Sequence, residues 1–117
     1  MTSNNRIAMV TGAGTGIGKQ TALLLLEAGY SVVLAGRRLK PLEQTVQEAG
    51  VPDARTLVMS TDVGNPEAVA ALFAATEAKF GRLDVLFNNA GVGAFAVPLE
   101  DLSYETWRTV LDTCVTG

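Results

Sequence analysis

Glycines near the start of the chain have the spacing of a turn that could bind an anion. Gly12, Gly16 and Gly18 lie between an apolar run at residues 7–10 and a second apolar run at residues 21–26. Within a helix a glycine costs about 1 kcal/mol relative to alanine, a cost expected where a ligand approaches the main chain closely. Free N–H groups and the helix dipole favour negative charge at a helix N-terminus, so a strand, turn and helix here could hold a diphosphate. The same glycines could instead serve only to pack the helix closely against a sheet.

Two arginines follow the next apolar run, where the ribose of a dinucleotide held by the glycine turn would lie. Sites specific for NAD place a carboxylate about 20 residues after the glycines, where it binds the ribose 2′-hydroxyl. No carboxylate occurs between Glu27 and Glu43, and the run at residues 31–35 leads instead to Arg37 and Arg38. Guanidinium groups suit phosphate, so the sequence favours NADP over NAD, with Arg37 as the main ligand of the 2′-phosphate. Alternatively, either arginine is a solvated charge on a loop.

Apolar, β-branched runs alternate with helical patterns along the whole chain. This alternation predicts an α/β fold, a Rossmann-like three-layer α/β/α arrangement with a parallel sheet of strand order 3-2-1-4. Residues 1–117 are expected to form a single NAD(P)-binding half domain. Strands are expected at residues 6–11, 31–35, 55–59 and 83–88, and helices at residues 16–28, 41–49, 66–80 and 104–115.

The predicted sheet ends at its fourth strand. Residues 91–102, with Phe95, Val97 and Pro98 among them, are expected to form a long loop that could line a substrate pocket. The fourth strand, normally central in such folds, would then be an edge with unpaired backbone groups. We therefore expect a chain truncated before a fifth strand, which associates as a homo-oligomer through that edge or is marginally soluble.

Composition excludes several classes of site and partner. The net charge of −3, without a basic block, argues against nucleic acid as a partner. The chain has no histidine, which excludes a histidine-based triad. Its one cysteine, Cys114, cannot form an internal disulfide or build a zinc site. A lone cysteine fits a reducing, cytoplasmic compartment. No apolar run reaches the roughly 20 residues of a membrane span, and the polar N-terminus shows no export signal.

Three motifs, in this order, resemble the short-chain dehydrogenase/reductase family. They are Thr11-Gly12-x-x-x-Gly16-Ile17-Gly18, Asp62-Val63 and Asn88-Asn89-Ala90-Gly91. The resemblance covers essentially the whole chain and implies an oxidoreductase that transfers hydride between NADP and an alcohol or ketone, the substrate itself being unknown. In that family the glycines bound the diphosphate turn, the Asp-Val pair sits at the adenine and the asparagine motif flanks the ribose. The implied cofactor-binding residues are Gly12, Thr15, Gly16, Ile17, Gly18, Arg37, Asp62, Val63, Asn88, Ala90 and Gly91.

The residues alone leave two of these roles open. Asp62 could accept a hydrogen bond from the adenine amino group, or it could cap the turn before Asn65. The segment at residues 88–91 could bind the ribose side of the site, or it could simply be a turn, which asparagine and glycine favour.

The catalytic residues that the resemblance implies are missing. The family uses a serine and a tyrosine followed four residues later by a lysine, but here Tyr30 is followed by Leu34 and Tyr104 by Arg108. Arginine stays charged and is the wrong cation for a proton relay, so no catalytic residue is expected. Cys114 stands where the family has an asparagine, and it could also be a small core residue. The alternatives are a non-catalytic dinucleotide-binding or interaction module and an inert truncated fragment.

Overall fold

The computed structural model describes residues 6–14, 16–62, 64–88 and 95–98 of the chain. Within these residues, five strands form one sheet in the order β3-β2-β1-β4-β5. The first four strands are parallel to one another, and β5 runs antiparallel to β4. The strands are β1 (Ile7–Thr11), β2 (Ser31–Gly36), β3 (Thr56–Ser60), β4 (Val85–Asn88) and β5 (Phe95–Pro98).

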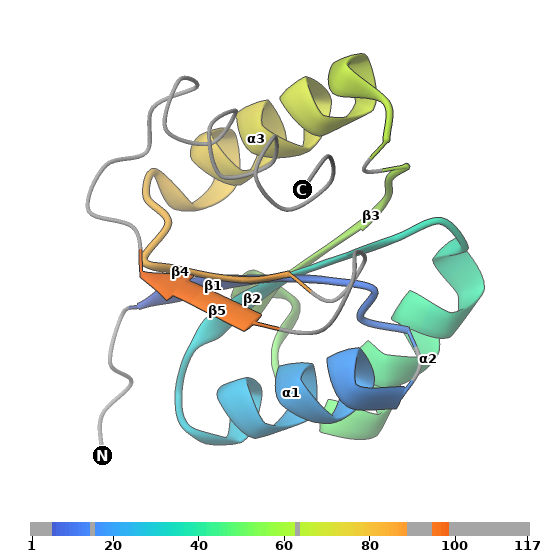
Figure 1. Cartoon of the computed structure of the whole chain (residues 1–117). Helices are drawn as coiled ribbons and strands as arrows, with labels where there is room; N and C mark the ends of the chain where they lie inside the picture. The colour runs from blue at the N-terminus through green and yellow to red at the C-terminus, as the bar shows by residue number, and fades with distance from the viewer. Residues whose placement is uncertain (1–5, 15, 63, 89–94, 99–117) are drawn as a thin grey trace.

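Helices cover both faces of this sheet. Figure 1 shows α1 and α2 on one face and α3 on the other. The predicted three-layer α/β/α arrangement with parallel order 3-2-1-4 is therefore confirmed. The helix expected at residues 41–49 begins earlier, at Leu39, because Pro41 fits in a first turn, where its missing N–H has no helical partner to lose. The helices are α1 (Gly16–Glu27), α2 (Leu39–Ala49) and α3 (Pro66–Phe80), with a short 3-10 helix, η1 (Asp53–Arg55), before β3.

The expectation of a loop that leaves β4 at the edge of the sheet is wrong. β5 pairs with β4 along its whole length, from Val85 opposite Pro98 to Asn88 opposite Phe95. A short run that ends in proline gives little strand signal along the sequence, and proline is tolerated on edge strands. β5 hydrogen-bonds the backbone groups of β4 that a four-stranded sheet would leave unpaired. β4 is therefore not an edge strand, and the predicted association of two chains through an exposed β4 loses its basis. The helix expected at residues 104–115 lies outside the described residues.

The core lies on both faces of the central strands. All of β1 is buried, and its successive side chains point to opposite faces. Met9 belongs to an apolar cluster with Leu72 of α3. Val10 belongs to a second cluster, with Leu26 of α1 and Leu42 of α2. Both faces of β1 are thus covered by helices, as parallel sheets require.

Both ends of α3 are closed by residues of the chain itself. The side-chain oxygen of Asn65 accepts hydrogen bonds from the backbone N–H groups of Glu67 and Ala68, at 2.9 and 3.3 Å. Gly81 ends the helix in the left-handed region, with φ of 76°. Asn65 and Gly81 thus bound α3, whose range agrees with the helix predicted at residues 66–80.

Asp84 joins β1 to the start of β4 at the amino edge of the sheet, away from the strand ends where ligands bind. Its carboxylate accepts the backbone N–H of Ile7 at 2.8 Å and pairs with Arg82 at 2.5 Å. Burial acts to raise the pKa of this carboxyl, but the hydrogen bonds from Arg82 and Ile7 and the charges of Arg82 and Arg6 outweigh burial. The pKa of Asp84 therefore lies below its ordinary value.

The outer edge of β3 is partly covered by a lysine of α3. The Lys79 ammonium donates to the backbone carbonyl of Asp53 at 2.9 Å and to that of Thr56. A lysine at an edge strand opposes pairing with another chain, because a new strand would have to bury the charge.

Candidate cofactor-binding site

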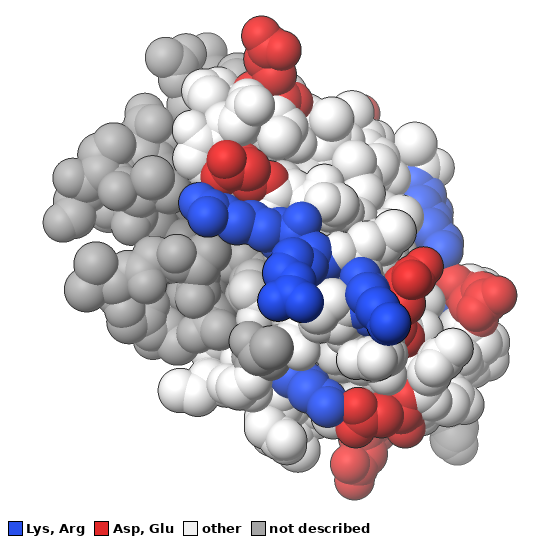
Figure 2. Space-filling view, turned by 90° about the vertical axis from the view of Figure 1, so that its right-hand side faces the viewer, with Lys and Arg blue, Asp and Glu red and all other residues white. Residues whose placement is uncertain are grey.

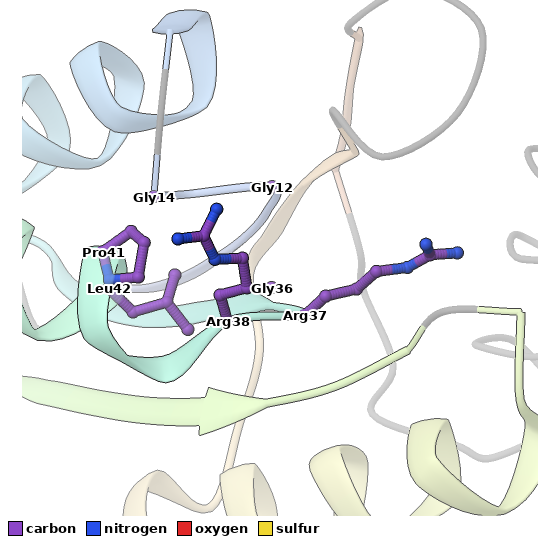
Figure 3. Close-up of a pocket in the computed structure, with 7 residues that line it drawn as sticks. All are labelled: Gly12, Gly14, Gly36, Arg37, Arg38, Pro41 and Leu42. Carbon is purple, nitrogen blue, oxygen red and sulfur yellow. The ribbon is translucent and has the colours of Figure 1, made fainter.

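The carboxyl ends of β1 and β2 open into a cavity of about 190 Å³. The turn that follows β1 leads to α1, and the turn that follows β2 leads to α2; Figure 3 shows both turns at this cavity. Ligands of open α/β sheets bind at this edge, so the cavity is the candidate site. Its lining residues are Gly12, Gly14, Gly36, Arg37, Arg38, Pro41 and Leu42.

The glycines of the first turn are required by its backbone and its neighbours. Gly12 and Gly16 have φ of 63° and 58°, in the left-handed region that side chains disfavour. A Cβ atom at Gly14 would lie 2.7 Å from the Cβ of Pro41, closer than such atoms approach. Gly18 is buried within α1. The turn therefore fits against α2 only with a bare main chain, the kind of surface that a diphosphate can approach.

Sequence reasoning did not single out Gly14 or its contact with Pro41. The turn is also fixed to β2, because the Ala13 N–H donates to the Ala35 carbonyl at 3.2 Å. The sequence does show Gly14 as one more glycine between Gly12 and Gly16. Its contact with Pro41 could not be predicted, because that contact depends on how α2 packs against the turn. Beside the turn, the Ile17 side chain is 63% exposed although it is apolar.

The two arginines point in different directions. Figure 3 shows the Arg38 side chain reaching across the cavity toward Gly12 and Gly14, while the Arg37 side chain extends away from it. Arg38 has extended backbone, with φ of −114° and ψ of 122°, and successive side chains of extended chain point to opposite sides. The geometry thus places Arg38 over the cavity, although sequence reasoning favoured Arg37.

Asp62 closes the turn before α3. Its Oδ1 atom accepts the Gly64 N–H at 2.9 Å, and its backbone carbonyl accepts the Asn65 N–H at 2.9 Å. The capping role that the sequence left open is therefore present. The same Oδ1 atom lies 3.7 Å from the Arg37 guanidinium. Both side chains are largely exposed, so this pair contributes little to stability, but it brings Asp62 beside the turn that follows β2.

The other predicted site residues lie at the same edge or outside the described residues. Phe87 of β4 is in register with Val10 of β1, so Asn88 is level with the end of β1. Thr15, Val63, Ala90 and Gly91 lie outside the described residues, and so do Tyr104 and Cys114.

Basic side chains gather on the surface around the cavity despite the negative net charge. Figure 2 shows blue side chains near the middle of this face, with an acidic group beside them. Arg37, Arg38 and Lys40 are exposed here in succession, where β2 ends and α2 begins. Such a local excess of positive charge attracts an anionic ligand even when the whole chain is acidic.

The described residues contain no metal cluster and no membrane-spanning helix. Across residues 6–14, 16–62, 64–88 and 95–98, no cluster of three acidic, cysteine or histidine side chains could hold a metal ion. Over these ranges no helix has the length and apolar character needed to cross a membrane.

The sequence matches a known family over nearly its whole length. A sequence model of the family described as short chain dehydrogenase matches residues 6–117. The chain belongs to the short-chain dehydrogenase family. The chain is similar to a cyclohexanol dehydrogenase from Acinetobacter sp., with 38% identity over 109 residues. The match covers 93% of this chain and 43% of that relative, so the chain spans less than half of the relative's length.

Solved structures give the same fold with two different cofactors. A short-chain dehydrogenase/reductase from Burkholderia phymatum in complex with NAD is 39% identical, with a TM-score of 0.69, covering 75% of this chain and 31% of that one. The C-domain, with NADP, of a bacterial malonyl-CoA reductase is 35% identical, with a TM-score of 0.67, covering 75% of this chain and 15% of that one. Membership in the family therefore supports a dinucleotide cofactor without selecting between NAD and NADP.

Proposed function

We propose that this short-chain dehydrogenase is the cofactor-binding half of an NADP-dependent oxidoreductase that transfers hydride between an alcohol and a ketone. The observation that carries the choice of NADP is the Arg38 side chain across the cavity between the glycine turn and α2. The end of β2 offers no carboxylate for a ribose 2′-hydroxyl, since the chain there reads Gly36-Arg37-Arg38. A 2′-phosphate in this cavity would meet the guanidinium directly.

The start of α2 supports the same assignment. Arg38 is the residue before the helix, and its side chain makes no capping hydrogen bond to the first turn. The backbone N–H groups of that turn therefore have no side-chain cap and favour an anion. An arginine and an uncapped helix start at the same cavity form a coherent phosphate site, while the bare glycine turn provides room for the diphosphate.

We assign the remaining cofactor contacts by their places along the chain. Each belongs to a stretch of sequence that ends or follows a strand of the parallel sheet. Arg37 would contact the adenosine end beside Asp62 rather than the phosphate itself. The proposed diphosphate contacts are Gly12, Thr15, Gly16, Ile17 and Gly18; the adenine contacts are Asp62 and Val63; and the ribose contacts are Asn88, Ala90 and Gly91.

The bound cofactor would supply the hydride, and the role of this chain would be to bind and orient it. The 117 residues contain no tyrosine followed four residues later by lysine, the pair that moves the proton in this family. We propose that these residues come from the rest of a longer protein, and that the 117 residues alone bind NADPH without reducing a ketone. Binding without turnover is also what a non-catalytic dinucleotide-binding module would show, and the missing pair favours that second candidate for the chain by itself.

Titration with NADPH and NADH, followed by nucleotide fluorescence, tests the cofactor assignment. We expect NADPH to bind more tightly than NADH, and Arg38→Asp to raise the Kd for NADPH about 10- to 100-fold, the value of one charge-assisted hydrogen bond. The Kd for NADH should change much less.

Lys40→Asp is the matched control for this titration, because it makes the same change of charge at an exposed residue that does not line the cavity. Equal binding of the two nucleotides by the unmodified chain would contradict the choice of NADP. Equal losses in the Arg38 and Lys40 variants would contradict the role of Arg38. Consumption of NADPH with cyclohexanone would contradict the expected lack of turnover.

We also propose a homo-oligomer located in the cytoplasm. The single cysteine fits a reducing compartment, and Leu24 of α1, which is 64% exposed, offers an apolar contact. Size-exclusion chromatography of the chain and of Leu24→Glu tests the assembly, and a monomer in both cases would contradict it.

A further inference from the structure

A buried hydroxyl of α2 lies behind the glycine turn. Thr45 is fully buried, in a helix whose neighbouring buried residue, Leu42, is apolar. Its Oγ1 atom lies 3.0 Å from the carbonyl oxygen of Pro41, one turn earlier in the same helix. The same atom lies 3.4 Å from the carbonyl oxygen of Ala13 in the glycine turn. A buried hydroxyl must be hydrogen-bonded to avoid a cost in stability, and the single proton of this one is shared between the two carbonyl oxygens.

The position of the Ala13 carbonyl fixes the direction of the next backbone N–H. The peptide bond between Ala13 and Gly14 is trans, because no cis peptide occurs among the described residues. A trans peptide is planar and points its C=O and N–H to opposite sides. With its carbonyl toward Thr45, this peptide directs the Gly14 N–H away from the Thr45 hydroxyl.

The same side of the turn is held in place by two further contacts. Gly14 rests against Pro41, so closely that no Cβ atom would fit. The Ala13 N–H is bonded to the Ala35 carbonyl of β2. Ala13 is therefore held by β2 at its N–H, in the peptide before the one discussed, and by α2 at its carbonyl, where the Thr45 hydroxyl is the polar group of α2.

We propose that Thr45 is a positioning residue for the dinucleotide: its hydroxyl holds the Ala13–Gly14 peptide so that the Gly14 N–H faces the anionic cofactor. The inference rests on the proposed function, and it adds a residue that lies outside the three family motifs. It also explains why α2 carries a threonine at a buried position where an apolar residue would fill the core. Through Thr45 and Arg38, a single helix would orient both the glycine turn and the 2′-phosphate site.

The chain offers a matched control on the other face of the sheet. Thr76 of α3 is fully buried as well, and its Oγ1 atom donates to the carbonyl of Leu72, one turn earlier, at 2.9 Å. Thr76→Val therefore removes the same kind of hydrogen bond from the same kind of helix position without touching the glycine turn. Any general effect of losing a buried hydroxyl appears equally in both variants.

The test compares Thr45→Val, Thr45→Ser and Thr76→Val in the 117-residue chain. The Kd for NADPH should rise about three- to tenfold in Thr45→Val, the value of one neutral hydrogen bond, and stay within about twofold of the unmodified chain in the other two. In the free protein, the Gly14 amide resonance should shift in Thr45→Val and not in Thr45→Ser or Thr76→Val. Thr45→Ala replaces Thr45→Val should the valine variant not fold.

The outcomes separate this inference from the proposed function. Unchanged NADPH binding by Thr45→Val, or equal losses in Thr45→Val and Thr76→Val, would overturn the role of Thr45 while leaving the cofactor assignment intact. An unmodified chain that binds no NADPH would overturn the proposed function, and the Gly14 amide then decides whether Thr45 orients the peptide. An unshifted Gly14 amide in Thr45→Val would overturn the inference in either case.

Discussion

Two helices that start at the same edge of the sheet begin in opposite ways. α3 begins at Asn65, whose side-chain oxygen accepts the first free N–H groups of the helix. α2 begins at Arg38, whose side chain makes no such bond and extends over the cavity instead. A capped helix start gains stability, whereas an uncapped one leaves N–H groups for a ligand. The comparison indicates that the start of α2, where we propose that the cofactor binds, lacks the stabilising cap that the start of α3 has.

The largest expected effect comes from filling the space beside the glycine turn. Gly14→Val places a side chain where even a Cβ atom would lie 2.7 Å from Pro41, so the turn must move away from α2. We expect loss of measurable NADPH binding, together with destabilisation of about 1–3 kcal/mol from overpacking. Fluorescence titration and urea unfolding measure the two effects.

Gly50→Ala is the control for this variant, because Gly50 follows α2 with positive φ and has open space around it. It should lower stability with little change in NADPH binding. A Gly14→Val chain that binds NADPH normally would show that the contact with Pro41 does not shape the site.

Giving α2 a capping side chain should have a smaller effect, which raises stability and lowers NADPH affinity. Arg38→Ser supplies a capping side chain to α2 and should raise the free energy of unfolding by up to about 1 kcal/mol while weakening NADPH binding. Urea unfolding and NADPH titration of the same preparation check this pair of changes. A variant that is both less stable and unchanged in binding would contradict the comparison.

The reciprocal change at α3 should alter stability alone. Asn65→Ala removes the cap that bonds Glu67 and Ala68 and should cost about 1 kcal/mol of stability. NADPH affinity should stay within about twofold, less than the value of one hydrogen bond. An affinity loss as large as that of Arg38→Ser would mean that the start of α3 also belongs to the binding site.

The smallest effect is expected at the amino edge of the sheet, and it depends on pH. The pKa of Asp84 is lowered in the folded state, so the folded chain binds fewer protons there than the unfolded chain. Its contribution to stability is fully present above the unfolded pKa of about 3.9 and is lost as the pH falls through the folded pKa. Asp84→Asn should remove this part of the pH dependence.

Urea unfolding at pH values from about 6 down to about 3 measures the difference between the two chains. The stabilities of Asp84→Asn and the unmodified chain should converge as the pH falls. A gap that stays constant would show that the ion pair and hydrogen bonds of Asp84 do not set its pKa.

Most of the architecture could be predicted from the sequence, because helix ends and buried strands are signalled by residues close together in the chain. Asn65, Pro66 and Gly81 bound α3 through interactions within a few residues, and the apolar runs around residues 7–10 and 31–35 predict buried parallel strands. Most of the glycine turn could be predicted because Gly12 and Gly16 have positive φ, a backbone conformation that glycine favours whatever its neighbours.

The features that sequence reasoning missed depend on contacts between distant segments. The apolar run of β5 is too short to predict a strand, and β5 is a strand because it pairs with β4. Which of Arg37 and Arg38 faces the cavity depends on how the end of β2 is twisted into α2. The role of Thr45 is visible only because α2 packs against the turn at Ala13, 32 residues earlier in the chain.

The antiparallel β5 also determines where further strands could join this sheet. β4 is flanked by β1 on one side and β5 on the other, so both of its rows of hydrogen-bonding groups are occupied. A parallel strand could reach β4 only by strand exchange, with Phe95–Pro98 as the leaving segment. At the opposite side, an incoming strand would have to dislodge the Lys79 ammonium from the carbonyls of Asp53 and Thr56. Extension of the sheet beside β4 is thus a competition between two strands for one row of peptide groups.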